Sequence, residues 1–317
     1  MATKRKCNPQ RSYACGKSCI RKSYACRIEF PIGVSQSLSE KRRIVFDTGE
    51  ENTVPRKPES TPTGKPFEDL TLDERLSAMY KKFPSELAEM DRILREEDPD
   101  SSFFYDNLMK ETKSIHNKLL SQVSEDEAKA WSSQLKISGD VSQKELNALQ
   151  KHLETVYRLT GGRVNANALE AVEVNTAAVN VNYFSPMEKR IQLSDGYIGY
   201  TVYHEMGHAL EASHGSRFKA LDSSFQFLNR VGINTDSSSS EKVYYSNFSD
   251  SYFQYSGTVE AVEAKKVRTA YAGRDYKGVA TEVVSTGLEL FNHPIDMAIG
   301  YENAKDHFLF TLSHLIK

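Results

Sequence analysis

The sequence predicts an α+β fold with its helices in the first half and a small sheet after them. Apolar residues recur at helical spacing through residues 67–163, and from about residue 164 apolar and polar residues alternate as they do in half-buried strands. The basic charge and the cysteines of the N-terminal residues set that segment apart from this fold. We therefore expect four parts, which are residues 1–30, 31–66, 67–163 and 164–317.

The N-terminal segment differs from the rest of the chain in charge and in cysteine content. Residues 1–60 hold 13 Lys and Arg against 6 Asp and Glu, a net charge of +7, whereas the whole chain has a net charge of −2. Thirty residues cannot bury a sufficient core, so we expect residues 1–30 to be a cross-linked module. A structural zinc ion on four thiolates and two disulfides are the alternatives. The four cysteines are Cys7, Cys15, Cys19 and Cys26.

This Cys-rich module resembles a known short element. Residues 15–20 (CGKSCI), with a cysteine before them and Cys-Arg after them, are similar to a module of cyanobacterial and phage-related proteins. The resemblance supplies context for the segment and no mechanism.

Residues 31–66 are expected to form a disordered linker. Five prolines lie there among Ser, Thr, Lys and Glu, and such a segment buries too little apolar surface to offset the entropy of ordering it. No stretch of the chain approaches the roughly 20 apolar residues of a membrane-spanning helix, and residues 1–20 lack the apolar centre of a signal peptide. We therefore expect a cytoplasmic protein, or one exported by a route that needs no such signal.

Helix start and stop signals mark the region 67–163. Ser124–Glu127 and Ser142–Glu145 match the capping-box pattern, in which a hydroxyl and a carboxylate satisfy the free amides of a helix start. The second motif precedes apolar residues at i, i+3, i+7 and i+10, and the pair Gly161-Gly162 ends this predicted helix. We expect a helical bundle that packs on or beside the downstream region. The apolar positions are Leu146, Leu149, Leu153 and Val156.

The region 164–317 begins with strand-like sequence. Valines recur between residues 172 and 181, and Arg190–Ser194 alternates polar and apolar residues. A helix is predicted to begin near Ile198. Peptide substrates commonly bind by adding a strand to an exposed sheet edge, and Ala177–Phe184 is the candidate for such an edge.

The predicted helix carries a metal-binding pattern at residues 204–208 (HEMGH). Histidines four positions apart project from the same face of a helix, so His204 and His208 can both reach one ion. Glu205 is rotated by about 100° from His204, so its carboxylate can stand beside water in the site without binding the ion. Zinc lowers the pKa of that water, and the carboxylate can take its proton. Gly207 costs up to about 1 kcal/mol in a purely structural helix, which favours a functional reason for it.

A catalytic zinc site has three protein ligands, and the sequence offers several candidates for the third. Glu282 lies among apolar or neutral residues on a predicted second helix, and a carboxylate in such surroundings needs a cation as its partner. His214 lies ten residues after His204, but a continuous helix would turn it away from both histidines. Two further candidates are Glu260 and Glu263.

Two segments around these residues resemble a known family. Residues 201–211 (TVYHEMGHALE) and 280–289 (ATEVVSTGLE), with an aromatic-rich stretch between them, look like the zinc metallopeptidase domain of phage minor head-type proteins and related bacterial toxins or effectors. The resemblance covers about residues 165–295. It implies a zincin-like fold of the gluzincin type, with a small sheet, an active-site helix and a second ligand helix.

The same resemblance implies the ligand set and the role of the acid. His204, His208 and Glu282 would hold one catalytic Zn²⁺, and Glu205 would act as general base. Thr286 departs from the pattern, because gluzincins place an Asp there that orients the first histidine, and this family commonly has Met. The second contact of that histidine is therefore in doubt.

The oxyanion of a peptidase reaction also needs a hydrogen-bond donor. Tyr276, six residues before Glu282, is the candidate that we assign to this role, and Tyr271 and Tyr255 are alternatives.

Two classes of function stay open from the sequence. The first is a zinc endopeptidase that acts on a protein or peptide substrate, docks to a phage-like particle or to secretion machinery through its basic N-terminal module, and is found in the cytoplasm or on a virion or injection particle. The second is a structural or interaction protein of a phage-like particle that keeps a metal-bound zincin scaffold without proteolysis. The eight positive charges of residues 1–28 permit contact with nucleic acid, but such a run is more often a solvated tail, and we do not expect a nucleic-acid partner.

Overall fold

The structure, a computed structural model, describes residues 12–15, 18–21, 70–139, 141–164, 167–175, 182–194, 199–214, 221–244 and 251–316. The predicted linker, most of the predicted edge segment Ala177–Phe184 and the four cysteine side chains lie outside this description. The chain divides into two compact units, one of Met1–Arg56 with Val243–Ser251 and one of Lys57–Lys242 with Tyr252–Lys317.

The first unit contains two short strands within the Cys-rich module. Strands β1 (Ser12–Cys15) and β2 (Ser18–Arg21) pair antiparallel, with Cys15 opposite Ser18 and Cys19 opposite Ala14. The zinc and disulfide alternatives for the four cysteines stay predictions.

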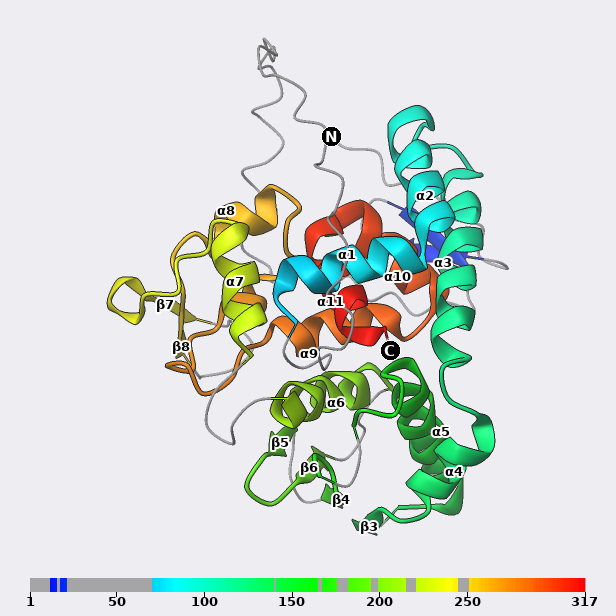
Figure 1. The fold of residues 1–317 in the computed structure, drawn as a ribbon, viewed down its shortest axis with the longest axis vertical. Helices are drawn as coiled ribbons and strands as arrows, with labels where there is room; N and C mark the ends of the chain where they lie inside the picture. The colour runs from blue at the N-terminus through cyan, green and yellow to red at the C-terminus, as the bar shows by residue number, and fades with distance from the viewer. Residues whose placement is uncertain are drawn as a thin grey trace. The chain divides into compact units, whose positions relative to one another are not determined.

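The second unit is mixed α and β, as the sequence predicts, and it begins with five helices (Figure 1). The predicted capping box at Ser142 is confirmed, since the Ser142 hydroxyl accepts the Glu145 N–H and the Glu145 carboxylate accepts the Ser142 N–H. The helix that follows ends at Leu159, just before two glycines with positive φ angles. At Ser124 only the hydroxyl half of the box forms. The five helices are α1 (Leu72–Lys82), α2 (Pro84–Glu96), α3 (Phe104–Leu120), α4 (Glu125–Ser132) and α5 (Gln143–Leu159).

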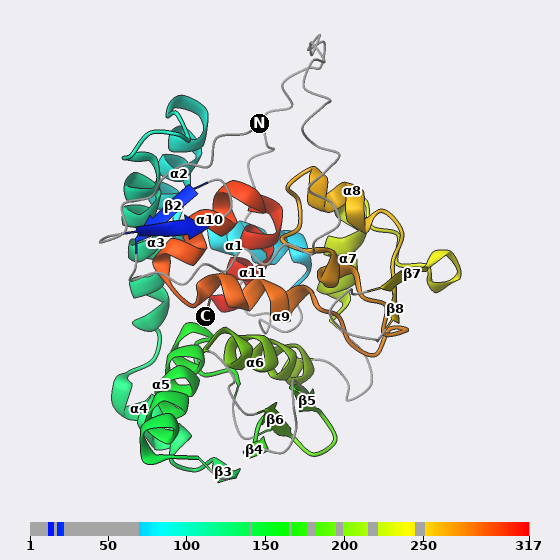
Figure 2. The same ribbon diagram turned by 180° about the vertical axis from the view of Figure 1, so that it is seen from behind.

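A four-stranded sheet lies under one long helix. The strand order is β3-β4-β6-β5, with β3 and β6 parallel to β4 and β5 antiparallel to β6. The sheet lies on one side of α6 (Gly199–His214), and α9 (Val283–Leu288) lies on the other (Figures 1 and 2). This double covering explains why α6 is uncharged on most of its surface. The strands are β3 (Lys136–Gly139), β4 (Ala171–Asn175), β5 (Tyr183–Ser185) and β6 (Arg190–Ser194).

Except for residues 243–251, the remaining elements belong to the same unit. Helix α1 packs on α11, α3 packs on α10 and α5 packs on α6. One continuous hydrophobic core therefore joins the regions on either side of residue 163. None of the described helices is both long and apolar enough to cross a membrane. These elements are α7 (Asp222–Arg230), β7 (Glu241–Tyr244), β8 (Ser251–Gln254), α8 (Thr258–Glu263), α10 (Pro294–Asn303), α11 (Lys305–Leu315) and the short 3₁₀ turns Ser237–Ser239, Ala270–Gly273 and Glu289–Phe291.

Helices α6 and α9 approach each other most closely at Gly207. A Cβ atom at this position would lie 2.9 Å from the Ser285 backbone nitrogen, 3.0 Å from the Val284 carbonyl oxygen and closer still to the Ser285 Cα. These are backbone atoms, which cannot rotate away as a side chain can. Gly207 is therefore required by the crossing of the two helices, and this accounts for a glycine in the middle of a helix.

The neutral form of His307 holds α11 against the start of α9. Its Nδ1 accepts the Arg268 N–H at 3.3 Å, so its Nε2 carries the hydrogen and donates to the Val283 carbonyl at 2.7 Å. Burial lowers the pKa of His307 to about 4. A protonated ring would place an N–H against the Arg268 N–H.

We predict that Gly207→Ala destabilises the fold by about 1–3 kcal/mol, because the added methyl group overpacks the helix crossing. Urea unfolding measures this loss. The matched control is Gly300→Ala in α10, where the three atoms nearest the added Cβ all belong to the Leu290 side chain, at 2.9, 3.0 and 3.3 Å, and none belongs to the backbone. A loss in Gly207→Ala no larger than in Gly300→Ala would contradict the role of the crossing.

We also predict that His307 makes the fold sensitive to acid. In the unfolded chain the imidazole binds a proton below about pH 6.5, whereas in the folded protein it does so only near pH 4. The free energy of unfolding therefore keeps its full contribution from neutral His307 above about pH 6.5 and loses it as the pH falls from about 6.5 towards 4. From pH 7 to pH 4.5, wild type should lose about 2 kcal/mol more than His307→Gln, because Gln offers one donor and one acceptor without titrating. Denaturant unfolding at both pH values measures the difference. His293→Gln, on an exposed residue, should follow wild type, and equal acid losses in His307→Gln and wild type would refute the assignment.

Candidate metal centre

Helix α6 places two histidines one turn apart beneath α9. The rings of His204 and His208 have centroids 5.0 Å apart and stand at 81° to each other. Each side chain is 15% exposed, so the ring edges reach solvent while the helix backbone stays buried. The two histidines therefore project from the same face of α6, as the sequence predicts.

The Glu282 carboxylate meets both histidines. Its Oε2 lies 3.2 Å from His204 Nε2 and 3.2 Å from His208 Nε2, and its side chain is only 1% exposed. The three atoms lie within 4.8 Å of one another. Glu282 is the residue that precedes the first turn of α9, rather than a residue inside the helix as the sequence suggests.

The spacing of these three atoms fits a metal ion. Tetrahedral zinc with bonds of about 2.0–2.1 Å separates its ligand atoms by about 3.4 Å, close to the two observed distances. The Nδ1 of His204 lies 2.8 Å from Glu289 Oε1, so Nδ1 holds a hydrogen and Nε2, once it has lost its proton, is the atom that can bind an ion beside Glu282. The donor set of two imidazoles and one carboxylate suits zinc.

The negative charges of Glu282 and Glu289 beside the two imidazoles must be balanced, either by protons on the histidines or by a cation. Although burial opposes both changes, hydrogen bonds to Glu282 and Glu289 raise the pKa of His204, and the two imidazoles lower the pKa of Glu282. The pKa of His208 is likewise raised, against burial, by Glu282. Because ligands must shed protons to bind a metal, a cation and these protons compete for the same atoms.

Glu205 lies beside the histidines with an unsatisfied oxygen. Its side chain is buried, with 3% of the residue exposed, and its Oε2 has no hydrogen-bond partner among the described residues. Burial raises the pKa of this carboxyl group. A buried carboxylate oxygen without a partner is costly, and water held between this residue and an ion would supply the missing contact.

Glu289 supplies the outer contact that Thr286 does not make. The Glu289 carboxylate binds His204 Nδ1 through Oε1 and accepts a hydrogen bond from Arg268 through Oε2. Despite burial, His204 and Arg268 lower the pKa of Glu289 and keep it ionised. Thr286 instead donates from its hydroxyl to the Glu282 carbonyl. Sequence reasoning missed Glu289, although its place seven residues after Glu282, two helical turns on, was a usable signal.

Another buried carboxylate, that of Glu211, positions the residue before Glu282. It accepts the Thr281 N–H at 2.9 Å, the Thr281 hydroxyl at 2.6 Å and the Ser224 hydroxyl at 2.9 Å. These three bonds offset part of the effect of burial, which raises the pKa of Glu211. Helix α6 continues through Glu211, whose bonds join α6, α7 and the start of α9.

The three candidate tyrosines lie in different surroundings. The Tyr276 hydroxyl donates to Glu282 Oε1, on the side of the carboxylate away from the histidines. Tyr271 lies with its ring centroid 6.0 Å from that of His204, and its hydroxyl accepts from Arg274 at 2.7 Å. Tyr255 is buried and hydrogen-bonded to Asp275. Tyr276 therefore contacts a candidate ligand directly, and Tyr271 adjoins the site.

The other candidate ligands are not part of this group. Glu260 and Glu263 are exposed residues of α8. The side chain of His214, at the end of α6, lies outside the described part of the chain. Within the described residues, the cluster that can hold a metal ion consists of His204, His208 and Glu282.

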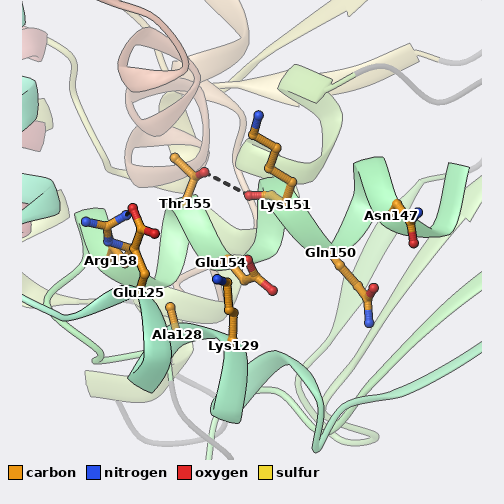
Figure 3. A pocket seen from close by; sticks show the side chains of 9 residues that line it. All are labelled: Glu125, Ala128, Lys129, Asn147, Gln150, Lys151, Glu154, Thr155 and Arg158. Carbon is orange, nitrogen blue, oxygen red and sulfur yellow. Dashed lines mark hydrogen bonds and ion pairs between the residues drawn. The ribbon is translucent and has the colours of Figure 1, made fainter. Parts of the chain in front are cut away.

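A separate hollow of about 410 Å³ lies between α4 and α5 (Figure 3). Charges of both signs line it, and one pair, Arg158 and Glu125, forms a salt bridge of 3.1 Å across it. None of its lining residues belongs to the metal cluster, so we interpret the hollow as a solvated groove between two surface helices. The lining residues are Glu125, Ala128, Lys129, Asn147, Gln150, Lys151, Glu154, Thr155 and Arg158.

We predict that Glu289→Gln weakens zinc binding by about 10–100-fold, because the partner of a ligating histidine fixes its tautomer and raises its basicity. Competition with a chromophoric chelator measures the affinity, and His208→Ala identifies any zinc bound elsewhere on the chain. Glu263→Gln, which removes an exposed carboxylate from α8, should bind zinc as wild type does. Equal affinities in Glu289→Gln and Glu263→Gln would disprove the orienting role.

Comparison with known proteins gives no match for this chain. No protein-family model, no curated protein and no solved structure matches it. The case for its function therefore rests on the geometry of the centre and on the sequence pattern of residues 204–208.

Proposed function

We propose that the chain is a zinc-dependent endopeptidase with a zincin-like fold of the gluzincin type. His204, His208 and Glu282 would hold the catalytic zinc ion, and Glu205 would act as general base. One observation carries the proposal. Three ligand atoms from two segments 74 or more residues apart lie within 4.8 Å of one another, with a buried carboxylate beside them whose Oε2 has no partner among the described residues.

A zinc ion bound there supplies Lewis acidity, which lowers the pKa of water and polarises a peptide carbonyl. Glu205 Oε2 accepts the proton of the attacking water and returns it to the leaving amine nitrogen. The raised pKa of Glu205 suits both transfers, because a general base works best with a pKa near the working pH. Glu289 holds His204 in the tautomer that presents Nε2 to the centre.

Tyr276 is the proposed donor to the oxyanion that forms from the peptide carbonyl. Its hydroxyl rests on Glu282 Oε1 and adjoins the ligand set. Burial and the charge of Glu282 raise the pKa of Tyr276, so the hydroxyl keeps its hydrogen and can donate it.

The sheet offers a place for the peptide chain. Among the described strands, β5 lies at one edge of the sheet, antiparallel to β6, and it packs against α6. A peptide that adds to this edge would run alongside the helix that carries the histidines. The basic Cys-rich module would then serve as a docking element, held by a structural zinc ion or by disulfides.

We predict that Glu205→Gln abolishes cleavage while zinc stays bound. The amide keeps the shape of the side chain but cannot accept the proton, so kcat should fall at least about 100-fold. Metal analysis of purified protein counts the zinc, and mass spectrometry of a proteome-derived peptide mixture reports cleavage. The double variant His204→Ala/His208→Ala should lose one zinc equivalent relative to wild type.

The outcomes separate the two functional classes. Cleavage that survives in Glu205→Gln would reject the mechanism. Zinc binding by wild type without any cleavage would instead favour a structural protein that keeps the metal-bound scaffold.

A further inference from the structure

Arg274 lies within a cage of three tyrosine rings. Its guanidinium carbon is 5.1 Å from the ring centroid of Tyr252, 5.5 Å from that of Tyr271 and 4.7 Å from that of Tyr276. Arginine is attracted to the faces of aromatic rings, and such rings limit how far its head can move. The cage therefore holds the guanidinium group in place without neutralising it.

No described carboxylate forms an ion pair with Arg274. The hydrogen bond of its side chain goes from Nη1 to the Tyr271 hydroxyl at 2.7 Å. The carboxylate of the neighbouring Asp275 instead accepts hydrogen bonds from the Ser240 hydroxyl at 2.9 Å and from the Lys277 N–H. Glu282 faces the two histidines. A partly buried, positioned guanidinium group with unused donors is a receptor for a planar anion, above all a carboxylate bound through two parallel hydrogen bonds.

The cage adjoins the metal centre. Tyr276 contacts Arg274 with its ring and Glu282 with its hydroxyl, and the Tyr271 ring lies 6.0 Å from that of His204. The side chain of Tyr276 therefore lies between Arg274 and the candidate ligand Glu282. Arg274 itself is only partly buried.

The backbone around Arg274 is fixed by β8. The Tyr255 N–H donates to the Gly273 carbonyl, and the Asp275 N–H donates to the Phe253 carbonyl at 2.9 Å. The Arg274 N–H itself donates to the Tyr271 carbonyl. A receptor on a backbone with these bonds loses little entropy when it binds its ligand.

We propose that Arg274 sets the substrate specificity of the centre by binding a carboxylate of the peptide close to the scissile bond. The carboxylate belongs either to an Asp or Glu side chain or to the C-terminus of the peptide. This inference rests on the proposed function, since it identifies the class of substrate that the same site accepts.

A binding experiment tests the receptor separately from catalysis. The probes are the monohydroxamates of malonic, succinic and glutaric acid, each compared with its neutral amide. The hydroxamate group anchors on zinc, and the three lengths place the carboxylate at three different separations from it. On zinc-loaded full-length wild type we expect the best-fitting acid to bind at least about 10-fold more tightly than its amide, a preference that salt weakens.

Variants assign this preference to Arg274. Arg274→Gln should reduce it to less than about twofold while zinc content stays at the wild-type value, and Arg274→Lys should retain part of it. The matched control is Arg230→Gln on α7, which removes an arginine paired with Asp73 and should keep the full preference. Equal binding of acid and amide to wild type would overturn the inference and leave the zinc centre intact. Failure of every hydroxamate to bind zinc-loaded wild type would overturn the inference together with the proposed function.

Cleavage of defined peptides identifies the source of the carboxylate. From a peptide that wild type cleaves in the proteome-derived mixture, two analogues are made, one with the nearest Glu or Asp changed to its amide and one with an amidated C-terminus. We expect one of them to lose at least about 10-fold in kcat/KM with wild type and to lose nothing with Arg274→Gln. A loss of kcat/KM in Arg274→Gln that is the same for acidic and neutral peptides would overturn a role in specificity.

Discussion

The crossing of α6 and α9 at Gly207 is the constraint on which the centre depends. The two histidines come from the middle of one helix and Glu282 from the start of the other, so the backbones must approach closely for their side chains to meet. A side chain at residue 207 would hold the helices apart at the point where their backbones meet. Because residue 207 has no side chain, the helices can approach closely enough for Glu282 Oε2 to lie 3.2 Å from the Nε2 atom of each imidazole.

The second feature of the centre is the number of carboxyl groups that the fold buries around it. Four carboxyl groups surround the centre, and the cost of burying each is offset to a different extent. Two belong to α6, Glu205 and Glu211, and two lie beside it, Glu282 and Glu289. Glu211 relies on hydrogen-bond donors, Glu289 on Arg268 and His204, and Glu282 on the two histidines. Glu205 has the least compensation among them. Because an uncompensated buried carboxylate is expensive, this residue is the one for which a function in chemistry explains the cost most directly.

Much of this arrangement follows from the sequence, and the reasons for the exceptions are physical. The periodic apolar residues and the capping motif at Ser142 mark their helices because local signals act within a few residues. The meeting of His204 and His208 was predictable because spacing on a helix fixes direction, whereas the choice of Glu282 from several candidates came from the family resemblance together with its apolar surroundings. Glu289 was not found, since the sequence was searched for a partner at Thr286 and the chain places it one turn later. Arg274 was not found, because the third ring of its cage, Tyr252, comes from a strand that only the tertiary fold brings to the turn of Tyr271, Arg274 and Tyr276.

The clamp that Glu211 makes on Thr281 has a consequence for the proposed metal site. The bonds from Glu211 join α6 to the residue before Glu282 and do not involve any of the three ligand atoms. The entropy lost in bringing these distant segments together is therefore spent when the chain folds. Small zinc proteins that lack such a clamp become ordered only when they bind their ion. In this chain the proposed ligands would instead be brought together by bonds of the fold itself, so an ion that binds them would spend little of its binding energy on ordering the chain.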